Sequence, residues 1–316
     1  MLTPLLGYLA LLGVCILGSL SVNSMLGQWV CLEVNMLCII PVLVYSMTED
    51  SILTGVKYFI SQSAASLMFV LGLFLSMKMS VAMIFMTLSI FFKLGLPPMQ
   101  SWLTSMLPSM SWMSMWLIFT VQKIIPLTIL SFLKLNPFVF GLTLFGGLFF
   151  ILGSLSQVSS LFMLMFLSSV ANGMWALSVV GVSGNWGMFM GAYSLLLLSV
   201  MMSFSALKIS SVGSFANVGL SAGLMLSLQF LNLGGLPPLL GFLIKLMMMK
   251  QLVSVSFLVL SALILSSLGV LFVYVSVTHQ SYCFNSALKI SNGGQWVSML
   301  SYFTLAVSGL GIWFLI

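Results

Sequence analysis

The chain has 316 residues, of which 61% are hydrophobic and only 4% are charged. That composition leaves too little polar surface to coat a soluble globule of this length, so it indicates an integral membrane protein. The net charge of +6 comes from lysines that are scattered singly along the chain, which argues against a nucleic-acid partner.

Hydropathy, interpreted together with the breaks at Gly, Pro, Asn and Lys, predicts about eleven membrane-spanning helices. A helical span needs about 20 mostly apolar residues, and a helix satisfies its own backbone groups in lipid. The predicted spans are 2–22, 25–46, 53–76, 80–104, 110–133, 136–155, 158–181, 185–207, 219–249, 254–277 and 295–316. We therefore expect an all-α, polytopic transmembrane bundle that forms a single integral membrane domain over residues 1–316. The first span lacks a basic leader, so we expect it to be retained and not cleaved as a signal peptide.

Four ionisable residues lie inside these apolar spans, and they are Glu33, Lys93, Lys123 and Lys245. Each is unfavourable by roughly 2.5–3.5 kcal/mol on insertion scales, which amounts to about 10 kcal/mol for the set. Burial disfavours the charged form of an amine, and Glu33 is the only acid available within the spans as a counter-ion. The set is typical of a proton path. Two alternatives remain open: Glu33 neutralises one buried lysine, or all four charges serve packing in a scaffold.

Two similar stretches interrupt the fourth and ninth spans, Leu94–Pro98 (LGLPP) and Leu233–Pro238 (LGGLPP). A proline has no N–H to donate to the carbonyl four residues earlier. Pro97, Pro98, Pro237 and Pro238 are therefore expected to free the carbonyls of Lys93, Leu94, Leu233 and Gly234, respectively. Free carbonyls are tolerated in a membrane only inside protein or beside water. The sequence therefore predicts two discontinuous helices in matching positions of two pseudo-repeats, roughly 25–207 and 219–316, the second incomplete. The alternative is that these prolines only kink packed helices.

The fifth span repeats the pattern on a smaller scale in Gln122–Pro126 (QKIIP). Pro126 frees the carbonyl of Gln122, so an amide, the Lys123 amine and a carbonyl are expected at one level. We expect the Gln122 side chain to order water there.

Intrinsic redox sites are excluded by the residues available to hold them. The chain has one histidine, His279, and four cysteines without a C-x-x-C pair, so neither a bis-histidine haem nor a cysteine-held cluster can be built. A phosphate-binding G-x-x-x-x-G-K-[ST] motif is also missing from the sequence. We expect no cofactor and no metal in this chain.

At the same residues the sequence resembles a known family. The matching stretches are Trp29–Pro41 (WVCLEVNMLCIIP), Phe92–Trp102 (FKLGLPPMQSW), Gln122–Pro126, Ser168–Trp175 (SSVANGMW) and Leu233–Lys245 (LGGLPPLLGFLIK). In order and spacing they are similar to the chain 2 family of mitochondrial NADH:ubiquinone oxidoreductase, respiratory complex I, in its animal and more specifically invertebrate form. The resemblance covers most of the chain, from about residue 25 to residue 250.

The resemblance implies an antiporter-like fold and a place in the membrane arm of the complex, in the mitochondrial inner membrane. Glu33 and Lys93 would form an ion pair, Lys123 would be a central relay, and Lys245 would lead to the second half-channel. NADH, FMN, iron–sulfur clusters and ubiquinone would belong to partner subunits. The chain would contact other membrane-arm subunits, including the other antiporter-like chains, and lipid.

Two residues depart from the family pattern, because Gln100 and Asn172 stand where histidine is usual. Neither side chain titrates near neutral pH, so we expect both to hold water by hydrogen bonds instead. A different function also stays open at this point, namely a stand-alone or Mrp-type cation/proton antiporter subunit built on the same fold.

Overall fold

The computed structural model describes residues 2–76, 82–133, 137–154, 160–182, 186–216, 218, 220–237, 239–253 and 257–285. These residues form helices and no strand. The chain divides into two compact units, Met1–Gly146 and Gly147–Ile316. The predicted span 295–316 and Pro238 lie outside the described residues.

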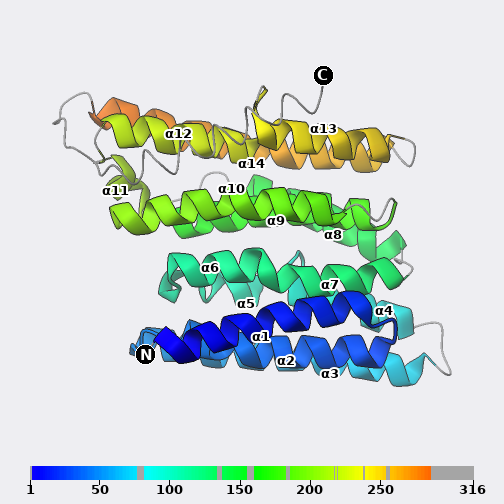
Figure 1. Ribbon diagram of the computed structural model, residues 1–316. Coiled ribbons are helices and arrows are strands. Elements are labelled where there is room, and N and C mark those ends of the chain that lie inside the picture. Colours follow the sequence, from blue (N-terminus) through cyan, green and yellow to red (C-terminus); the bar gives the residue numbers. More distant parts are fainter. Residues whose placement is uncertain are drawn as a thin grey trace. The chain divides into compact units, whose positions relative to one another are not determined.

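The first unit is built from long helices that pack against their neighbours in sequence. Its elements are α1 (Leu2–Ser21), α2 (Met25–Leu43), α3 (Glu49–Leu75), α4 (Ala82–Leu94), α5 (Ser101–Thr104), the 3₁₀ turn η1 (Leu107–Ser109), α6 (Trp112–Phe119), α7 (Val121–Phe132) and the first part of α8 (Pro137–Ser154). Contacts join α1 to α2, α2 to α3 and α3 to α4, and α7 touches α1, α2 and α4. Figure 1 shows α1, α2 and α3 side by side.

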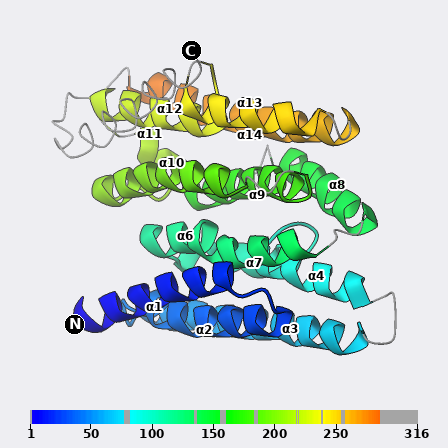
Figure 2. The ribbon, with the colours of Figure 1, turned by 45° about the vertical axis from the view of Figure 1, so that its right-hand side comes forward.

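The second unit surrounds one central helix. After α8 come α9 (Leu161–Val180), α10 (Trp186–Leu207), α11 (Val212–Ala216), α12 (Leu220–Gly234), α13 (Leu240–Leu252) and α14 (Phe257–Asn285). Nearly all of α9 is buried, and it contacts α10, α13 and α14. Figure 2 shows α12, α13 and α14 running together within this unit. A helix buried on all faces is enclosed by protein.

Short polar residues set the beginnings of several helices. The side chain of Ser24 accepts a hydrogen bond from the N–H of Gly27 at the start of α2. Thr48 does the same for Ser51 at the start of α3, and Glu49 and Asp50 occupy the first turn of that helix, where its dipole favours acids. Both caps lie close to the beginning of a predicted span. Over most of the described chain, the helix boundaries agree with the predicted boundaries within a few residues.

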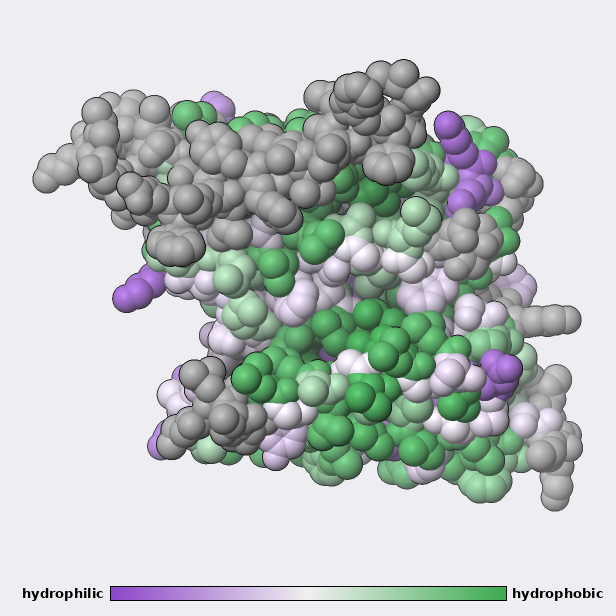
Figure 3. Space-filling model, viewed as in Figure 1, coloured by the Kyte–Doolittle hydropathy of each residue, from purple (hydrophilic) through white to green (hydrophobic). Residues whose placement is uncertain are grey.

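The surface and the helix lengths both fit a lipid environment. Among the described residues, six helices are long and apolar enough to cross a membrane. Large apolar side chains are open to the surroundings on several helices, and Leu17, Phe74, Phe149, Met188 and Phe257 are each at least 68% exposed. Figure 3 shows such hydrophobic side chains, in green, across much of the visible face. The protein is a multi-pass membrane protein.

Candidate functional site

The first predicted break has a defined local structure at the end of α4. Gly95 has φ of +65°, a left-handed conformation that favours glycine. The N–H of Gly95 donates to the carbonyl of Phe92 at 3.0 Å, and the N–H of Leu96 donates to that of Phe91 at 3.2 Å. This pair of bonds is the Schellman motif, which ends a helix. Lys93 therefore lies in the last turn of α4, where the helix dipole favours a cation.

Trp102 packs against the C-terminal end of α4. Its indole Nε1–H donates to the carbonyl of Phe92 at 3.0 Å, and its ring stacks on that of Phe92 with centroids 6.3 Å apart. Pro97 is buried and Pro98 is exposed in the segment between α4 and α5. The Oε1 atom of Gln100, at the start of α5, is buried without a hydrogen-bond partner among the described residues.

The second break repeats this local structure at the end of α12. Gly235 has φ of +84°, its N–H donates to the carbonyl of Asn232 at 3.2 Å, and the N–H of Leu236 donates to that of Leu231 at 3.1 Å. Glycine and leucine thus occupy the same two positions of a Schellman motif as at the first break. The similarity of the two proline-containing stretches in sequence corresponds to a similarity in backbone structure. Pro237 follows this turn and is exposed.

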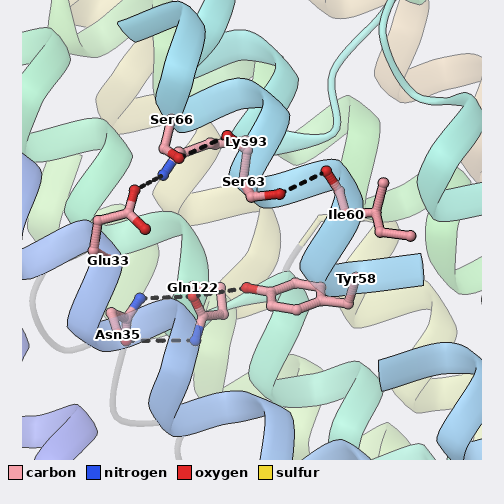
Figure 4. Close-up of polar contacts among 8 residues, drawn as sticks. All are labelled: Glu33, Asn35, Tyr58, Ile60, Ser63, Ser66, Lys93 and Gln122. Carbon is pink, nitrogen blue, oxygen red and sulfur yellow. Dashed lines mark hydrogen bonds and ion pairs between the residues drawn. The ribbon is translucent and has the colours of Figure 1, made fainter. Parts of the chain in front are cut away.

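In the first unit, Lys93 faces Glu33 of α2, as Figure 4 shows. Lys93 Nζ lies 3.9 Å from Glu33 Oε1, and their side chains are 4% and 23% exposed. No described group donates a hydrogen bond to Oε1. At this distance and an effective dielectric constant of about 20, the attraction is about 4 kcal/mol. Among the described residues, electrostatic attraction and not a hydrogen bond holds this pair. Glu33 Oε1 can therefore form a hydrogen bond to a different group without first losing an existing hydrogen bond.

A second polar group in the first unit joins three helices around Gln122. Asn35 Nδ2 of α2 donates to Gln122 Oε1 at 2.6 Å, and Gln122 Nε2 returns a bond to Asn35 Oδ1 at 3.4 Å. The hydroxyl of Tyr58 on α3 donates to the same Oε1 at 3.3 Å, as Figure 4 also shows. The Gln122 amide is therefore bound by protein groups, which fixes the start of α7 against α2 and α3.

Lys123 is 5% exposed and lies in the first turn of α7. Its Nζ is 5.9 Å from the centroid of the Phe119 ring, within the range of a cation–π contact. The backbone at Thr120, with φ of −121° and ψ of −70°, separates α6 from α7. Pro126 is buried inside α7, which continues through it. The dipole at the beginning of a helix disfavours a cation, so the surroundings of Lys123 differ from those of Lys93.

In the second unit, Lys245 binds the C-terminal end of α12. The residue is 7% exposed, and its Nζ donates to the carbonyl of Gly234 at 2.8 Å. Gly234 is the last residue of α12, and its carbonyl is among those that the prolines were predicted to free. A Cβ atom on Gly235 would lie 3.1 Å from Lys245 Cδ, so glycine leaves the space that the lysine stem occupies. The amine of Lys245 thus sits at a helix C-terminus, like that of Lys93.

The break between α12 and α13 is fixed by Asn232. Its Oδ1 accepts a hydrogen bond from the N–H of Gly241 at 3.0 Å, in the first turn of α13. A Cβ atom on Gly241 would collide with the backbone oxygen of Asn232. Only glycine at position 241 lets the first turn of α13 approach the backbone of α12 so closely.

A small cavity lies beside Lys245. It measures about 10 Å³ and is lined by the polar residues Asn172, Tyr193 and Lys245 and by the apolar residues Phe189, Leu196, Leu233, Gly241 and Ile244. Asn172 lies on α9 and its Nδ2 donates to the carbonyl of Ser168 at 2.9 Å. The structure thus brings together Asn172 and Lys245, which the sequence had singled out separately.

Sequence reasoning missed four residues of these sites: Asn35, Tyr58, Asn232 and Gly241. Asn35 and Asn232 lie within or next to the motifs that were recognised, so their proximity to Glu33 and to the second break was an available signal. Tyr58 carries no such signal, because nothing in its neighbourhood along the chain distinguishes it from a packing tyrosine.

Comparison with known proteins gives the family. No family model matches the sequence. The NADH-ubiquinone oxidoreductase chain 2 of Artemia franciscana is 34% identical over 275 residues, which cover 85% of this chain and 87% of that protein. The protein of the same name from Locusta migratoria is 28% identical over 305 residues, which cover 92% of this chain and 87% of that protein.

Two solved structures have a similar fold. A chain of respiratory complex I from Thermus thermophilus with bound aureothin matches with a TM-score of 0.74 and 19% identity, over 95% of this chain and 76% of that one. A chain of the Mrp complex from Dietzia sp. matches with a TM-score of 0.73 and 14% identity, over 85% of this chain and 59% of that one. The fold alone does not separate these two assemblies, but the identity to the Artemia protein extends over most of both chains. This chain belongs to the NADH-ubiquinone oxidoreductase chain 2 family.

Proposed function

We propose that this chain is a proton-translocating membrane-arm subunit of NADH:ubiquinone oxidoreductase, respiratory complex I. The observation that carries the proposal is the pair of the buried Lys93 and the partly exposed Glu33, 3.9 Å apart and without a hydrogen bond to Glu33 Oε1 from any described group. A buried charge pair whose partner can be exchanged is a switch, because separation favours the neutral form of each group. Membership of the NADH-ubiquinone oxidoreductase chain 2 family supports the proposal that this switch acts within complex I.

The mechanism begins when electron transfer elsewhere in the assembly shifts the pairing of Glu33 and Lys93. Protons then redistribute among Lys93, Lys123 and Lys245 through water. The hydrogen bond from Lys245 to the Gly234 carbonyl supports this role. It fixes the amine at the end of α12 through one N–H group and leaves the other N–H groups for water. Gln100 supports a wet site near the first break, since its buried Oε1 has no described protein donor.

Several finer features belong to the same proposal. The chain would cross the mitochondrial inner membrane eleven times, with the fourth and ninth spans discontinuous and with pseudo-repeats at roughly 25–207 and 219–316. The identical Schellman ends at Gly95 and Gly235 support the repeat. The chain would contact other membrane-arm subunits, including antiporter-like ones, and lipid. NADH, FMN, iron–sulfur clusters and ubiquinone would be held by partner subunits.

The second candidate is a stand-alone or Mrp-type cation/proton antiporter subunit. The similarity in fold to the Mrp chain favours it as much as the similarity to the complex I chain favours the main proposal. The sequence relatives favour complex I, because the similar proteins from Locusta migratoria and Artemia franciscana are chains of NADH-ubiquinone oxidoreductase. Purified alone in liposomes, an antiporter would exchange cations for protons down a gradient, whereas a complex I subunit would be inert without its partners.

The test replaces Lys93 by methionine in the assembled enzyme, reconstituted in sealed liposomes. Proton transport and NADH oxidation are measured together. We expect Lys93→Met to reduce the number of protons moved per NADH oxidised. Lys250→Met is the control, since Lys250 is an exposed lysine in the last turn of α13. An unchanged ratio in Lys93→Met enzyme would exclude the proposed relay.

A further inference from the structure

Tyr193 is a buried tyrosine whose hydroxyl makes no hydrogen bond of good geometry to any described residue. It lies on α10, is 4% exposed, and its hydroxyl oxygen has no hydrogen-bond partner among the described residues. Buried hydroxyl groups are nearly always hydrogen-bonded to protein or to ordered water. The position of Tyr193 therefore points to a ligand for its hydroxyl.

The cavity beside Lys245 is where that ligand would bind. Tyr193, Asn172 and Lys245 all line it, and each of the three is at least nine-tenths buried. A volume of about 10 Å³ is close to the space that one water molecule needs. A water is stable in a cavity that offers two to four polar partners, and an amine, an amide and a hydroxyl meet that requirement. The rest of the lining is apolar, so the three polar groups are the hydrogen-bond partners that the cavity offers.

We propose that this cavity binds a water molecule between Lys245 and Tyr193, and that Tyr193 positions the water through which Lys245 exchanges its proton. The proposal rests on the proposed function and adds a positioning residue to it. In the exchange, Lys245 Nζ gives a proton to the water oxygen, and this water gives one of its own protons to a second water molecule of the proposed proton path, which is the acceptor. One proton enters the water and one leaves, so the water and Tyr193 end unchanged.

The surroundings of Tyr193 suit this role. On α9, the side chains of Ser168, Ser169 and Asn172 lie near its hydroxyl without forming a hydrogen bond of good geometry to it. The Asn172 amide does not titrate, so it can hold a water by hydrogen bonds without taking its proton. A hydroxyl both donates and accepts hydrogen bonds, whereas the ammonium group of lysine only donates. Tyr193 can therefore orient a water toward Lys245 and bond to a neighbour at the same time.

Tyr274 on α14 provides a close comparison, because its hydroxyl lies near Tyr193 and Ser168 but does not line the cavity. It is also fully buried, and its hydroxyl also lacks a described hydrogen-bond partner. It does not line the cavity, and its ring stacks on Phe230 with centroids 5.1 Å apart. Phenylalanine at either position removes one hydroxyl and keeps the ring, so the two variants differ in whether the hydroxyl reaches the cavity.

The test compares Tyr193→Phe, Tyr274→Phe and Lys245→Met in the complete enzyme in liposomes. Tyr193→Phe should slow NADH-driven proton transport roughly two- to tenfold, the factor expected for one lost hydrogen bond, and change its solvent isotope effect. Tyr274→Phe should leave both unchanged. If Tyr193→Phe behaves like Tyr274→Phe while Lys245→Met loses transport, the water proposal is wrong and the proposed function stands. Normal transport in Lys245→Met enzyme would overturn both.

A density map of the unaltered enzyme provides a second measurement that does not depend on whether the variants assemble. An ordered water within hydrogen-bond distance of both Lys245 Nζ and the Tyr193 hydroxyl is expected. A dry cavity would overturn the proposal.

Discussion

Replacing Glu33 by glutamine removes the carboxylate that faces Lys93 and keeps a side chain of nearly the same size. The two charges are 3.9 Å apart, which corresponds to about 4 kcal/mol at an effective dielectric constant of about 20. Because the Glu33 side chain is 23% exposed and not fully buried, we discount this attraction and expect a loss of about 2–4 kcal/mol. Breaking a buried pair by removing one partner is of similar size, about 3–5 kcal/mol.

The assay is proton transport by the assembled enzyme in liposomes, normalised to NADH oxidation. We expect Glu33→Gln to slow coupled transport by at least about tenfold, the equivalent of about 1.4 kcal/mol and so less than the energy of the pair. Glu49→Gln is the matched control, since Glu49 is an exposed acid in the first turn of α3.

A double-mutant cycle with Lys93→Met tests whether the two residues act as one unit. If they do, Glu33→Gln has little further effect once Lys93 is methionine, because the charge it would pair with is gone. The double variant should then be no slower than Lys93→Met alone. Independent, multiplicative effects would show that the two residues do not act as one unit, and normal transport in Glu33→Gln enzyme would show that transport does not need the pair.

Three further predictions concern the structure around the sites. Gly241→Ala should destabilise the enzyme by about 1–3 kcal/mol, because the added methyl group collides with the Asn232 carbonyl oxygen. Gly191→Ala is the control, since a Cβ atom at Gly191 meets no other atom within 4 Å. Thermal unfolding of the two purified variants compares their stabilities, and equal stabilities would contradict the described packing at Gly241. Asn232→Ala should lose about 0.5–2 kcal/mol by removing the cap of α13, and an unchanged unfolding temperature would disprove that role. Gln122→Leu should lose about 1–3 kcal/mol in the same measurement, since Tyr58 would lose its described acceptor; a neutral effect would mean that water replaces the amide.

Much of the fold could be predicted because the chain is so apolar. Where 61% of the residues are hydrophobic and only 4% are charged, the breaks at Gly and Pro are the main remaining signal, and they place most helix ends within a few residues. The Gly-Leu-Pro-Pro stretches predicted helix ends, and α4 and α12 stop there in the same Schellman geometry. The carbonyl of Gly234 was predicted to be free of its helix bond, and it accepts the bond from Lys245.

The partners of the polar side chains were harder to predict. Glu33 was expected to pair with a buried lysine because no other acid lies within the spans, and the structure has that contact with Lys93. Gln122 was expected to order water, but its amide is bound to Asn35 and Tyr58. Such bonds join helices far apart in sequence, and hydropathy does not encode which faces of two apolar helices meet. The cavity beside Lys245 depends on side-chain packing among α9, α10, α12 and α13, which no local pattern reveals.

A high-resolution density map of the assembled, hydrated enzyme would show whether the three buried amines are wet. If Lys93, Lys123 and Lys245 carry protons, ordered waters should lie within hydrogen-bond distance of each Nζ atom, with one beside Gln100 as well. Dry apolar packing around all three amines would leave protons no route and would rule out a relay through these residues.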